Sequence, residues 1–242
     1  MCEFNKYIQF LGPVRTGHTL IASLLSFHKK IGIGIETKPN IFKCNDFSRD
    51  YYFDNILNNI ENSNTKIKGN YDYFFNEDQT YISNLEIIGD TRTGIKPIKY
   101  LKNNKYKFYD FINLPIYWLV TLRNPFDNIQ SMSNMNKNLL EQNINMYHKS
   151  LNILNNMICD NYIFKNIIII YIEELILYKE QIFKNIFDFL EIEFEDELIE
   201  TITNYIFKKP RKVFNANEWT TDQIDIINQL INKNKLLKYY KR

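Results

Sequence analysis

Near its start the chain reads Tyr7-Ile-Gln-Phe-Leu-Gly-Pro-Val-Arg-Thr-Gly-His-Thr-Leu-Ile-Ala-Ser-Leu-Leu25. The first five residues are an apolar run of strand length, and a loop bounded by two glycines follows at 12–17. From His18 onward, leucine and isoleucine recur at the spacing of a helix. A strand, a glycine loop and a helix in this order predict an α/β protein that holds a phosphate, because loop N–H groups and the positive helix end converge on the anion.

The loop resembles the P-loop of nucleotide triphosphatases with one departure. Gly12 to Thr19 fits the pattern G-x-x-x-x-G-K-[ST] at every fixed position but one, since His18 stands where the lysine belongs. That lysine reaches the β- and γ-phosphates, so its absence argues against ATP chemistry, while the loop can still cradle a phosphate. A cation, Arg15, stands inside the loop instead. The alternative interpretation is a strand-to-helix turn that happens to contain two glycines.

Length and composition bound the possible functions. The 242 residues suit one α/β domain, 1–242, or one domain with a lid. Hydrophobic residues make up 45% and charged residues 24%, so a sizeable core is expected and disorder is not. A formal net charge of only +2 argues against nucleic-acid binding as the main task. Any anion site must therefore be a local cluster.

Cysteine usage and hydropathy favour a cytoplasmic protein. Cys2, Cys44 and Cys159 lie far apart and match neither a metal-site spacing nor a disulfide framework, which fits a reduced setting and no metal. The residues after Met1 do not look like a signal peptide. The longest apolar run, 167–172, is too short to span a bilayer, so no membrane span is expected.

Apolar runs elsewhere predict the remaining strands of a sheet. Strands are expected at 31–36, 85–89, 114–123 and 167–172, and helices at 95–102, 139–158, 179–190, 196–207 and 222–237. The unbroken run at 167–172 indicates burial on both faces, as in a parallel sheet. The predicted fold is therefore a three-layer α/β/α domain with a central parallel sheet, like that of P-loop triphosphatases.

Polar residues follow several of these strands. Glu36 ends a strand expected beside the phosphate loop, and Asp90 and Arg92 follow the next strand. Loops at the carboxyl ends of parallel strands line the ligand crevice, which makes all three candidates for the site. For Asp90 and Arg92, a simple ion pair in a turn is an equally good interpretation.

Aromatic residues are concentrated between Thr37 and Ser83. They are Tyr51, Tyr52, Phe53, Tyr71, Tyr73, Phe74, Phe75 and Tyr81. Helices packed on the sheet are the simpler explanation and the favoured one. The functional alternative is a cap over the substrate, since substrate sites often have aromatic walls.

A second polar motif follows the strand at 114–123. The chain continues Arg123-Asn-Pro-Phe-Asp127-Asn-Ile-Gln-Ser131, in which the proline suits a helix start and Asp127 its first turn. Arg123 and Ser131 then bracket the strand end and the second turn of the helix. Further on, Lys208-Lys-Pro-Arg211-Lys212 forms a basic cluster before Trp219, although solvated lysines are the usual meaning of such a run.

The two motifs together resemble those of the sulfotransferases that use 3′-phosphoadenosine 5′-phosphosulfate. Pro13 to Leu20 looks like the family's 5′-phosphosulfate loop. The run from Arg123 to Ser131 looks like its 3′-phosphate motif, in which an Arg and a Ser eight positions apart grip the phosphate. The resemblance spans nearly the whole chain in the expected order and is closest to bacterial and carbohydrate-type members. The physics agrees, because this donor has anions at both ends and Arg binds phosphate with two donors.

The resemblance implies an enzyme and its site residues. It implies in-line transfer of a sulfuryl group to a hydroxyl or amine, with adenosine 3′,5′-bisphosphate (PAP) as product and no metal. The residues implied to bind the donor are Pro13, Arg15, Thr16, Gly17, His18, Thr19, Arg123, Ser131, Arg211 and Lys212. Arg15 and His18 are also implied to be catalytic, with Glu36 as the general base and Asp90 as its rival. The segment 37–84 is then the acceptor-side cap, and the acceptor is a small-molecule, carbohydrate or lipid-linked hydroxyl.

Two departures from the family leave alternatives open. Most relatives have Lys where this chain has Arg15, and Arg cannot serve as a proton donor because it stays charged. His18 replaces a hydroxyl residue, so its side chain either contacts the sulfuryl group or simply packs. The alternatives are a small-molecule kinase with a degenerate P-loop and a non-catalytic nucleotide-binding protein of the same fold.

Overall fold

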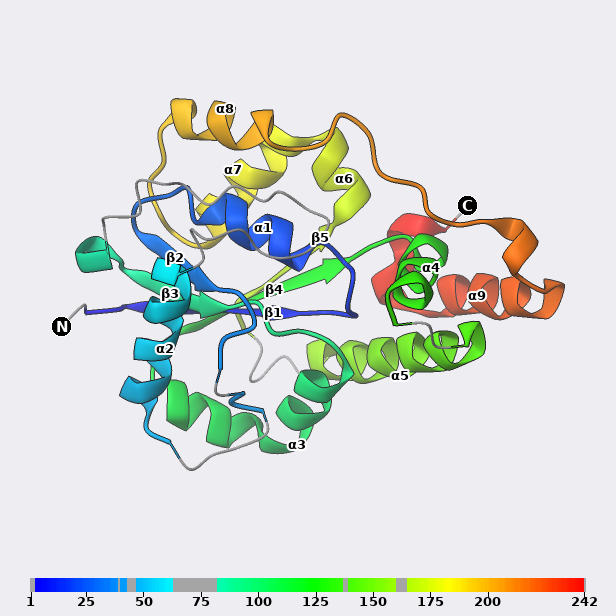
Figure 1. The fold of residues 1–242 in the computed structure, drawn as a ribbon, viewed down its shortest axis with the longest axis horizontal. Coiled ribbons are helices and arrows are strands. Elements are labelled where there is room, and N and C mark those ends of the chain that lie inside the picture. Colours follow the sequence, from blue (N-terminus) through cyan, green and yellow to red (C-terminus); the bar gives the residue numbers. More distant parts are fainter. Residues whose placement is uncertain are drawn as a thin grey trace.

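A parallel sheet between two layers of helices forms the framework of the protein (Figure 1). The computed structural model describes residues 3–38, 40–42, 47–62, 82–136, 139–159 and 165–241. Within these residues the sheet has five strands, all parallel, in the order β2-β3-β1-β4-β5. The predicted three-layer α/β/α fold is therefore confirmed.

The strand that precedes the phosphate loop lies at the centre of this sheet. The strands are β1 (Lys6–Leu11), β2 (Ile31–Gly34), β3 (Ile87–Asp90), β4 (Ile116–Leu122) and β5 (Ile167–Tyr171). β1 pairs with β3 on one side and with β4 on the other. Because the strands are parallel, the loops that follow β1, β3 and β4 all leave the sheet at its carboxyl edge, where open α/β sheets bind ligands.

Helices cover both faces of the sheet. In Figure 1, one face carries α1 (His18–Leu25), α6 (Ile172–Leu177), α7 (Lys179–Phe189) and α8 (Asp196–Asn204). The other face carries α2 (Arg49–Asn62), α3 (Ile95–Ile112) and α5 (Leu140–Cys159). α4 (Pro125–Asn136) follows β4, and α9 (Thr221–Lys233) packs on α4 and α5. Short 3-10 helices occupy Ile82–Asn84, Ala216–Glu218 and Lys235–Tyr240.

Successive side chains of a central strand point to opposite faces of the sheet, so the hydrophobic core has two parts, one on each face. Along β1, Tyr7 and Leu11 face the layer of α2, α3 and α5, whereas Ile8 and Phe10 face the layer of α1 and α7. All seven residues of β4 are buried. A strand that is buried on both faces needs apolar residues at nearly every position. Such a continuous apolar run is easy to recognise in the sequence, and β4 was predicted well for this reason.

Three elements differ from their predictions. β5 lies at the edge of the sheet and Ile167 to Ile169 are only half-buried, so the expected burial of this strand on both faces is wrong. α3 runs to Ile112, beyond the predicted end, with a non-helical residue at Asn104. The last helix ends at Lys233 and continues as a 3-10 helix.

The described part of the segment 37–84 belongs to the framework of the domain. Tyr52 and Phe53 of α2 are buried in the core, while Tyr51 is exposed. Tyr71, Tyr73, Phe74, Phe75 and Tyr81 lie outside the described residues. The acceptor-side cap therefore remains a prediction, and α2 itself is a packing helix.

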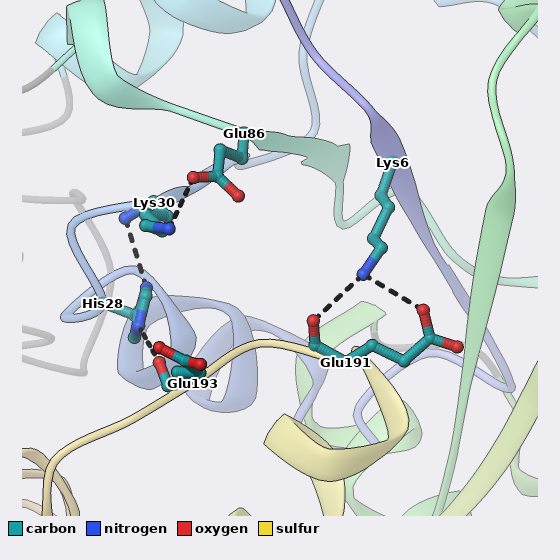
Figure 2. A network of polar contacts seen from close by, with 6 residues as sticks. All are labelled: Lys6, His28, Lys30, Glu86, Glu191 and Glu193. Carbon is teal, nitrogen blue, oxygen red and sulfur yellow. Dashed lines mark hydrogen bonds and ion pairs between the residues drawn. The ribbon is translucent and has the colours of Figure 1, made fainter.

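A polar network closes the amino-terminal edge of the sheet. Figure 2 shows its two parts: Lys6 contacts Glu191, and Lys30 contacts both Glu86 and His28, whose ring contacts the Glu193 carbonyl. The Lys6 ammonium donates to the Leu190 carbonyl at 2.6 Å and pairs with the Glu191 carboxylate at 3.4 Å. This network lies at the opposite end of β1 from the phosphate loop, so it fastens α7 to the sheet and takes no part in the site.

None of the helices in the described ranges has the length and apolar character needed to cross a bilayer.

Candidate functional site

The phosphate loop joins β1 to α1 and needs a glycine at each end. Gly12 has φ 139°, and a Cβ there would run into the backbone carbonyl of Thr121. Gly17 has φ 80° at the N-cap of α1, and a Cβ there would strike the side chain of Ile172. Left-handed backbone and close approach both demand glycine, so the two glycines of the motif have a structural cause.

Neighbouring strands and helices hold this loop in place. The Thr16 hydroxyl bonds to the Pro13 carbonyl at 2.9 Å and to the Thr121 hydroxyl at 2.7 Å. The Asn128 amide donates to the Val14 carbonyl at 2.9 Å. Because the Thr16 side chain is fully buried in these bonds, any contact of Thr16 with an anion has to come from its backbone.

The two predicted phosphate motifs meet at Arg15. Arg15 adopts φ 69°, which is unusual for a non-glycine residue, and its guanidinium Nε donates to the Ser131 hydroxyl at 3.2 Å. Ser131 lies on α4, two turns after Arg123 at the end of β4. Arg15 of the first phosphate motif is therefore hydrogen-bonded to Ser131 of the second.

His18 opens α1 as a buried, neutral ring. Its Nδ1 lies 3.4 Å from the Thr93 hydroxyl in the loop after β3. Burial, with a smaller contribution from the Arg15 charge, lowers the pKa of His18 to about 4. The ring is therefore uncharged at neutral pH and can exchange hydrogen bonds, but it does not replace the charge of a P-loop lysine. Thr19 follows in the first turn of α1 and is half-buried.

The basic cluster lies across the start of α4. Arg123 donates to the carbonyl of Arg211 at 2.8 Å. One carboxylate oxygen of Asp127 accepts the backbone N–H groups of Val213 and Phe214. The chain segments that carry these three cationic residues therefore lie side by side at the start of α4. The three were predicted together as donor-binding residues: Arg123, Arg211 and Lys212.

Aromatic and amide contacts reinforce the same junction. The Phe126 ring lies 4.9 Å from the Phe214 ring and 5.5 Å from that of Trp219, measured between centroids. The Trp219 indole N–H donates to Gln130 at 2.6 Å, and Gln130 donates to Glu218 at 2.7 Å. Sequence reasoning assigned Asp127 only to the helix start and did not single out Gln130, because their partners lie more than eighty residues away.

Glu173 fixes the backbone at the start of the second motif. It follows β5, and its carboxylate accepts the Asn124 N–H at 2.9 Å and the Tyr240 hydroxyl at 2.6 Å. The C-terminal 3-10 helix is thereby attached to the loop after β4. Glu173 therefore has a structural role, although it was not among the predicted site residues.

Asp90 and Glu36, the two predicted bases, have opposite environments. Asp90 is fully buried and accepts the Tyr52 hydroxyl at 2.9 Å, the Arg92 N–H at 3.1 Å and the Thr37 N–H at 3.3 Å. Burial raises the pKa of Asp90 to about 6, against the opposing effect of the Arg92 charge. Glu36 is exposed in a left-handed turn with φ 48°.

The sheet order changes the relation of both residues to the phosphate loop. β3 lies between β2 and β1, so the expectation that Glu36 ends a strand beside the loop is wrong, and the neighbouring strand carries Asp90. The Arg92 guanidinium donates to the carbonyls of Glu36 and Thr37. Arg92 therefore ties the turn after β2 to the loop after β3.

A pocket of about 360 Å³ opens beside the phosphate loop. Its lining residues are Pro13, Val14, Asn40, Arg92, Thr93, Gly94, Ile95, Lys96, Pro97, Met132, Met135, Met146 and Ser150. They come from the phosphate loop, the segment after β2, the loop after β3, and helices α3, α4 and α5. Among the residues that the structure describes, no three or more His, Cys, Asp or Glu side chains lie close enough together to hold a metal ion.

Solved structures share this fold at low sequence identity. Mouse sulfotransferase SULT7A1 complexed with PAP is 13% identical, with a TM-score of 0.55 over 98% of this chain and 90% of that chain. A sulfotransferase from Alicyclobacillus acidocaldarius is 14% identical, with a TM-score of 0.52 over 100% of this chain and 96% of that chain. A retinol dehydratase in complex with androsterone and inactive cofactor PAP is 12% identical, with a TM-score of 0.51 over 94% of this chain and 80% of that chain.

Sequence comparison adds no closer relative. No protein-family model matches the chain, and no curated protein matches it. The resemblance seen in the two phosphate motifs is nevertheless confirmed at the level of the fold, since structures named as sulfotransferases match over almost the entire chain. The protein therefore has the sulfotransferase fold.

Proposed function

We propose that this protein transfers a sulfuryl group from 3′-phosphoadenosine 5′-phosphosulfate to an acceptor hydroxyl. The observation that carries the proposal is the hydrogen bond between Arg15 and Ser131, which joins the two predicted phosphate motifs in one site. A donor with a phosphosulfate at one end and a 3′-phosphate at the other requires two linked anion sites.

The residues present fit such a donor. The glycine-bounded loop presents backbone N–H groups at the start of α1, where the helix end favours an anion. Arg123 donates to the Arg211 carbonyl, so the segment that carries the cations Arg211 and Lys212 lies beside Arg123 at the start of α4. His18, by contrast, supplies no charge where a P-loop triphosphatase has its lysine, which disfavours ATP as the donor.

Each residue then has a definable task in the transfer. The donor, when bound, supplies the sulfuryl group and a good leaving group. Arg15 stabilises the negative charge that develops on the oxygen bridging phosphorus and sulfur, and it remains charged throughout. His18 orients by hydrogen bonding, with its Nδ1 beside Thr93. Glu36 is the proposed base, because Asp90 is buried and already accepts three hydrogen bonds.

Calorimetric titration with three nucleotides tests the proposal. PAP should bind at least tenfold more tightly than 5′-AMP, because a lost charge-assisted contact costs roughly 1.5–3 kcal/mol. ATP should bind more weakly than PAP as well. Equal affinities for PAP and 5′-AMP would remove the 3′-phosphate site from the proposal, and a preference for ATP would favour the kinase alternative.

A further inference from the structure

Two hydrogen bonds connect the C-terminal 3-10 helix with the start of the second phosphate motif. This helix, Lys235–Tyr240, lies at the red end of the chain in Figure 1. The Tyr240 hydroxyl donates to one carboxylate oxygen of Glu173 at 2.6 Å, and the other oxygen accepts the Asn124 N–H at 2.9 Å. Asn124 directly follows Arg123, the residue predicted to bind the 3′-phosphate. The C-terminal helix is therefore linked to the backbone beside this cation.

We propose that Tyr240 is a positioning residue for the 3′-phosphate of the donor, and that its hydroxyl acts through Glu173 on the backbone at Arg123. The inference rests on the proposed sulfuryl transfer and gives the C-terminal helix a part in recognising the donor. It is carried by the peptide group that Glu173 fixes, by the cap that Asn124 provides for α4, and by the contacts that hold Tyr240 in place.

Glu173 fixes the peptide group that links Arg123 to Asn124. The N–H that it accepts belongs to this peptide, which is planar, so the bond restricts the backbone rotation of Arg123. That rotation sets the direction of the Arg123 side chain relative to α4. The guanidinium itself donates to the Arg211 carbonyl at 2.8 Å. A displaced peptide would therefore move this cation relative to a bound 3′-phosphate.

Asn124 extends the same constraint into α4. Its side-chain oxygen accepts the N–H of Phe126 at 3.1 Å and that of Asp127 at 3.4 Å, so it caps the helix. Ser131, the second residue of the predicted 3′-phosphate motif, lies on this helix. The bond from Glu173 to the Asn124 N–H therefore helps to hold both residues of the motif, Arg123 and Ser131.

The Tyr240 hydroxyl is held in place by its own surroundings. Its ring lies 5.6 Å from that of Tyr171, the last residue of β5, measured between centroids. The Tyr171 hydroxyl donates to the Leu236 carbonyl at 3.0 Å, and both Leu236 and Leu237 are buried. Burial, with a smaller contribution from the Glu173 charge, raises the pKa of Tyr240. The hydroxyl therefore keeps its proton and remains a donor.

The bond from Tyr240 is the stronger for ending on a charged group. A hydrogen bond to a carboxylate is roughly twice as strong as one between neutral groups. Glu173 is half-buried, so without this bond its carboxylate can turn toward water. Removing the Tyr240 hydroxyl should therefore loosen the hold of Glu173 on the Asn124 N–H, while the charge of the protein stays the same.

The test compares PAP with 5′-AMP by calorimetry in Tyr240→Phe. The two nucleotides differ only in the 3′-phosphate, so the ratio of their affinities reports on its site, whereas a general loss of structure weakens both. We expect the preference for PAP to fall by about threefold to tenfold, the scale of a weakened charge-assisted contact. Tyr239→Phe is the matched control, because it removes a hydroxyl from the neighbouring residue, which is 39% exposed and stacks on Tyr171. It should keep the parent preference.

Two changes at Glu173 separate position from charge. Glu173→Gln keeps an oxygen that can accept the Asn124 N–H, whereas Glu173→Ala removes both acceptors. Each removes one negative charge near the second motif, so by charge alone both should strengthen PAP binding equally. We expect instead that Glu173→Ala lowers the preference for PAP at least as much as Tyr240→Phe, and that Glu173→Gln lowers it less.

Hydrogen exchange at the Asn124 N–H checks the route. Exchange should accelerate in Tyr240→Phe, because the acceptor of this N–H is no longer held, and further in Glu173→Ala, where the acceptor is lost. Tyr239→Phe should exchange at the parent rate.

Failure of this inference is distinguishable from failure of the proposed function. If the parent protein binds PAP and 5′-AMP equally, the 3′-phosphate site is absent and the inference falls with the proposed function. If the parent prefers PAP, and Tyr240→Phe keeps this preference or weakens both nucleotides equally, only the inference is overturned. It is equally overturned if the preference falls while exchange at Asn124 is unchanged, since Tyr240 would then not act through Glu173.

Discussion

Arg15 and Ser131 are 116 positions apart in the chain, yet the guanidinium Nε of Arg15 donates a hydrogen bond to the Ser131 hydroxyl at 3.2 Å. The contact exists because β1 and β4 are neighbouring parallel strands. The loop after one and the helix after the other then emerge at the same edge of the sheet. An anion held by the loop is thereby within the reach of groups on α4.

The first prediction concerns Arg15 as a fixed charge. Arg15→Ala should slow single-turnover sulfuryl transfer about 10²-fold or more, the scale of losing one transition-state donor. Arg15→Lys should retain substantial activity, with some loss because an ammonium is a shorter point charge. Ser131→Ala removes the partner of Arg15 and should have a milder effect than Arg15→Ala. Transfer by Arg15→Ala at the parent rate would exclude a catalytic role for this residue.

The second prediction concerns Arg123 and the 3′-phosphate. Arg123→Ala should weaken PAP binding by roughly tenfold or more, from the loss of a charge-assisted contact. The affinity for 5′-AMP, which lacks the 3′-phosphate, should change much less. Calorimetry with both nucleotides makes the comparison. Lys29→Ala, at the opposite edge of the sheet, removes an exposed cation and serves as the control for net charge. If both nucleotides weaken equally in Arg123→Ala, this residue does not recognise the 3′-phosphate.

The third prediction concerns Asp127, which anchors the basic segment through the N–H groups of Val213 and Phe214. Removing a negative charge near a phosphate site should by itself strengthen PAP binding. We expect the opposite for Asp127→Ala, a loss of roughly threefold to tenfold, because the segment carrying Arg211 loses its attachment. Asp127→Asn keeps an oxygen acceptor and should lose less.

Hydrogen exchange supplies the independent readout for Asp127. Exchange at Val213 and Phe214 should accelerate in Asp127→Ala, because their N–H groups lose their acceptor. Tighter PAP binding with unchanged exchange would mean that Asp127 acts through its charge alone.

The strands and the phosphate loop could be predicted where the residue pattern along the chain matches the burial and backbone conformation that the fold imposes. The apolar runs of β1 and β4 are buried on both faces, and Gly12 and Gly17 stand where positive φ is required. Strand order was not readable, because it depends on which strands pair. The expected closeness of Glu36 to the phosphate loop failed for this reason, since β3 pairs between β2 and β1.

The motifs named candidate site residues, but they did not indicate which residues these contact. Sequence placed Arg123 with Ser131, whereas the described contacts place Arg15 on Ser131 and Arg123 on the Arg211 carbonyl. The roles of Asp127 and Gln130 depend on residues more than eighty positions away, so no local pattern could indicate them. The pocket escaped prediction for the same reason, because its methionines are separated from the phosphate loop by more than a hundred residues.

The fourth prediction distinguishes the two carboxylates. Glu36→Gln should keep PAP binding and lose turnover, because Glu36 is exposed and its carboxylate is the proposed base. Asp90→Asn should keep most of its activity, since Asp90 is buried against Tyr52 and two backbone N–H groups. Turnover at saturating donor, with an acceptor found by screening sugars, phenols and amines, makes the measurement. Full activity of Glu36→Gln with an inactive Asp90→Asn would reverse the assignment.

The last prediction follows from the pKa of Asp90, which burial raises from 3.8 to about 6 in the folded protein. Between these values the folded state binds more protons than the unfolded state, so the free energy of unfolding falls as the pH rises. The stabilisation is present below about pH 4 and lost above about pH 6. From 1.36 kcal/mol per pH unit, the loss is about 3 kcal/mol. Asp90→Asn cannot ionise and should not show it.

Urea unfolding of both proteins from pH 4 to pH 7 measures the difference directly. Contributions from other carboxylates cancel, so the stability of Asp90→Asn relative to the parent should rise with pH by about 2–2.5 kcal/mol across this window. Asp54→Asn is the matched control, because Asp54 is an exposed carboxylate on α2, the helix that supplies Tyr52. Its stability difference from the parent should stay within about 0.5 kcal/mol at every pH. A relative stability of Asp90→Asn that is flat with pH would mean that Asp90 titrates in the folded protein as it does in the unfolded chain.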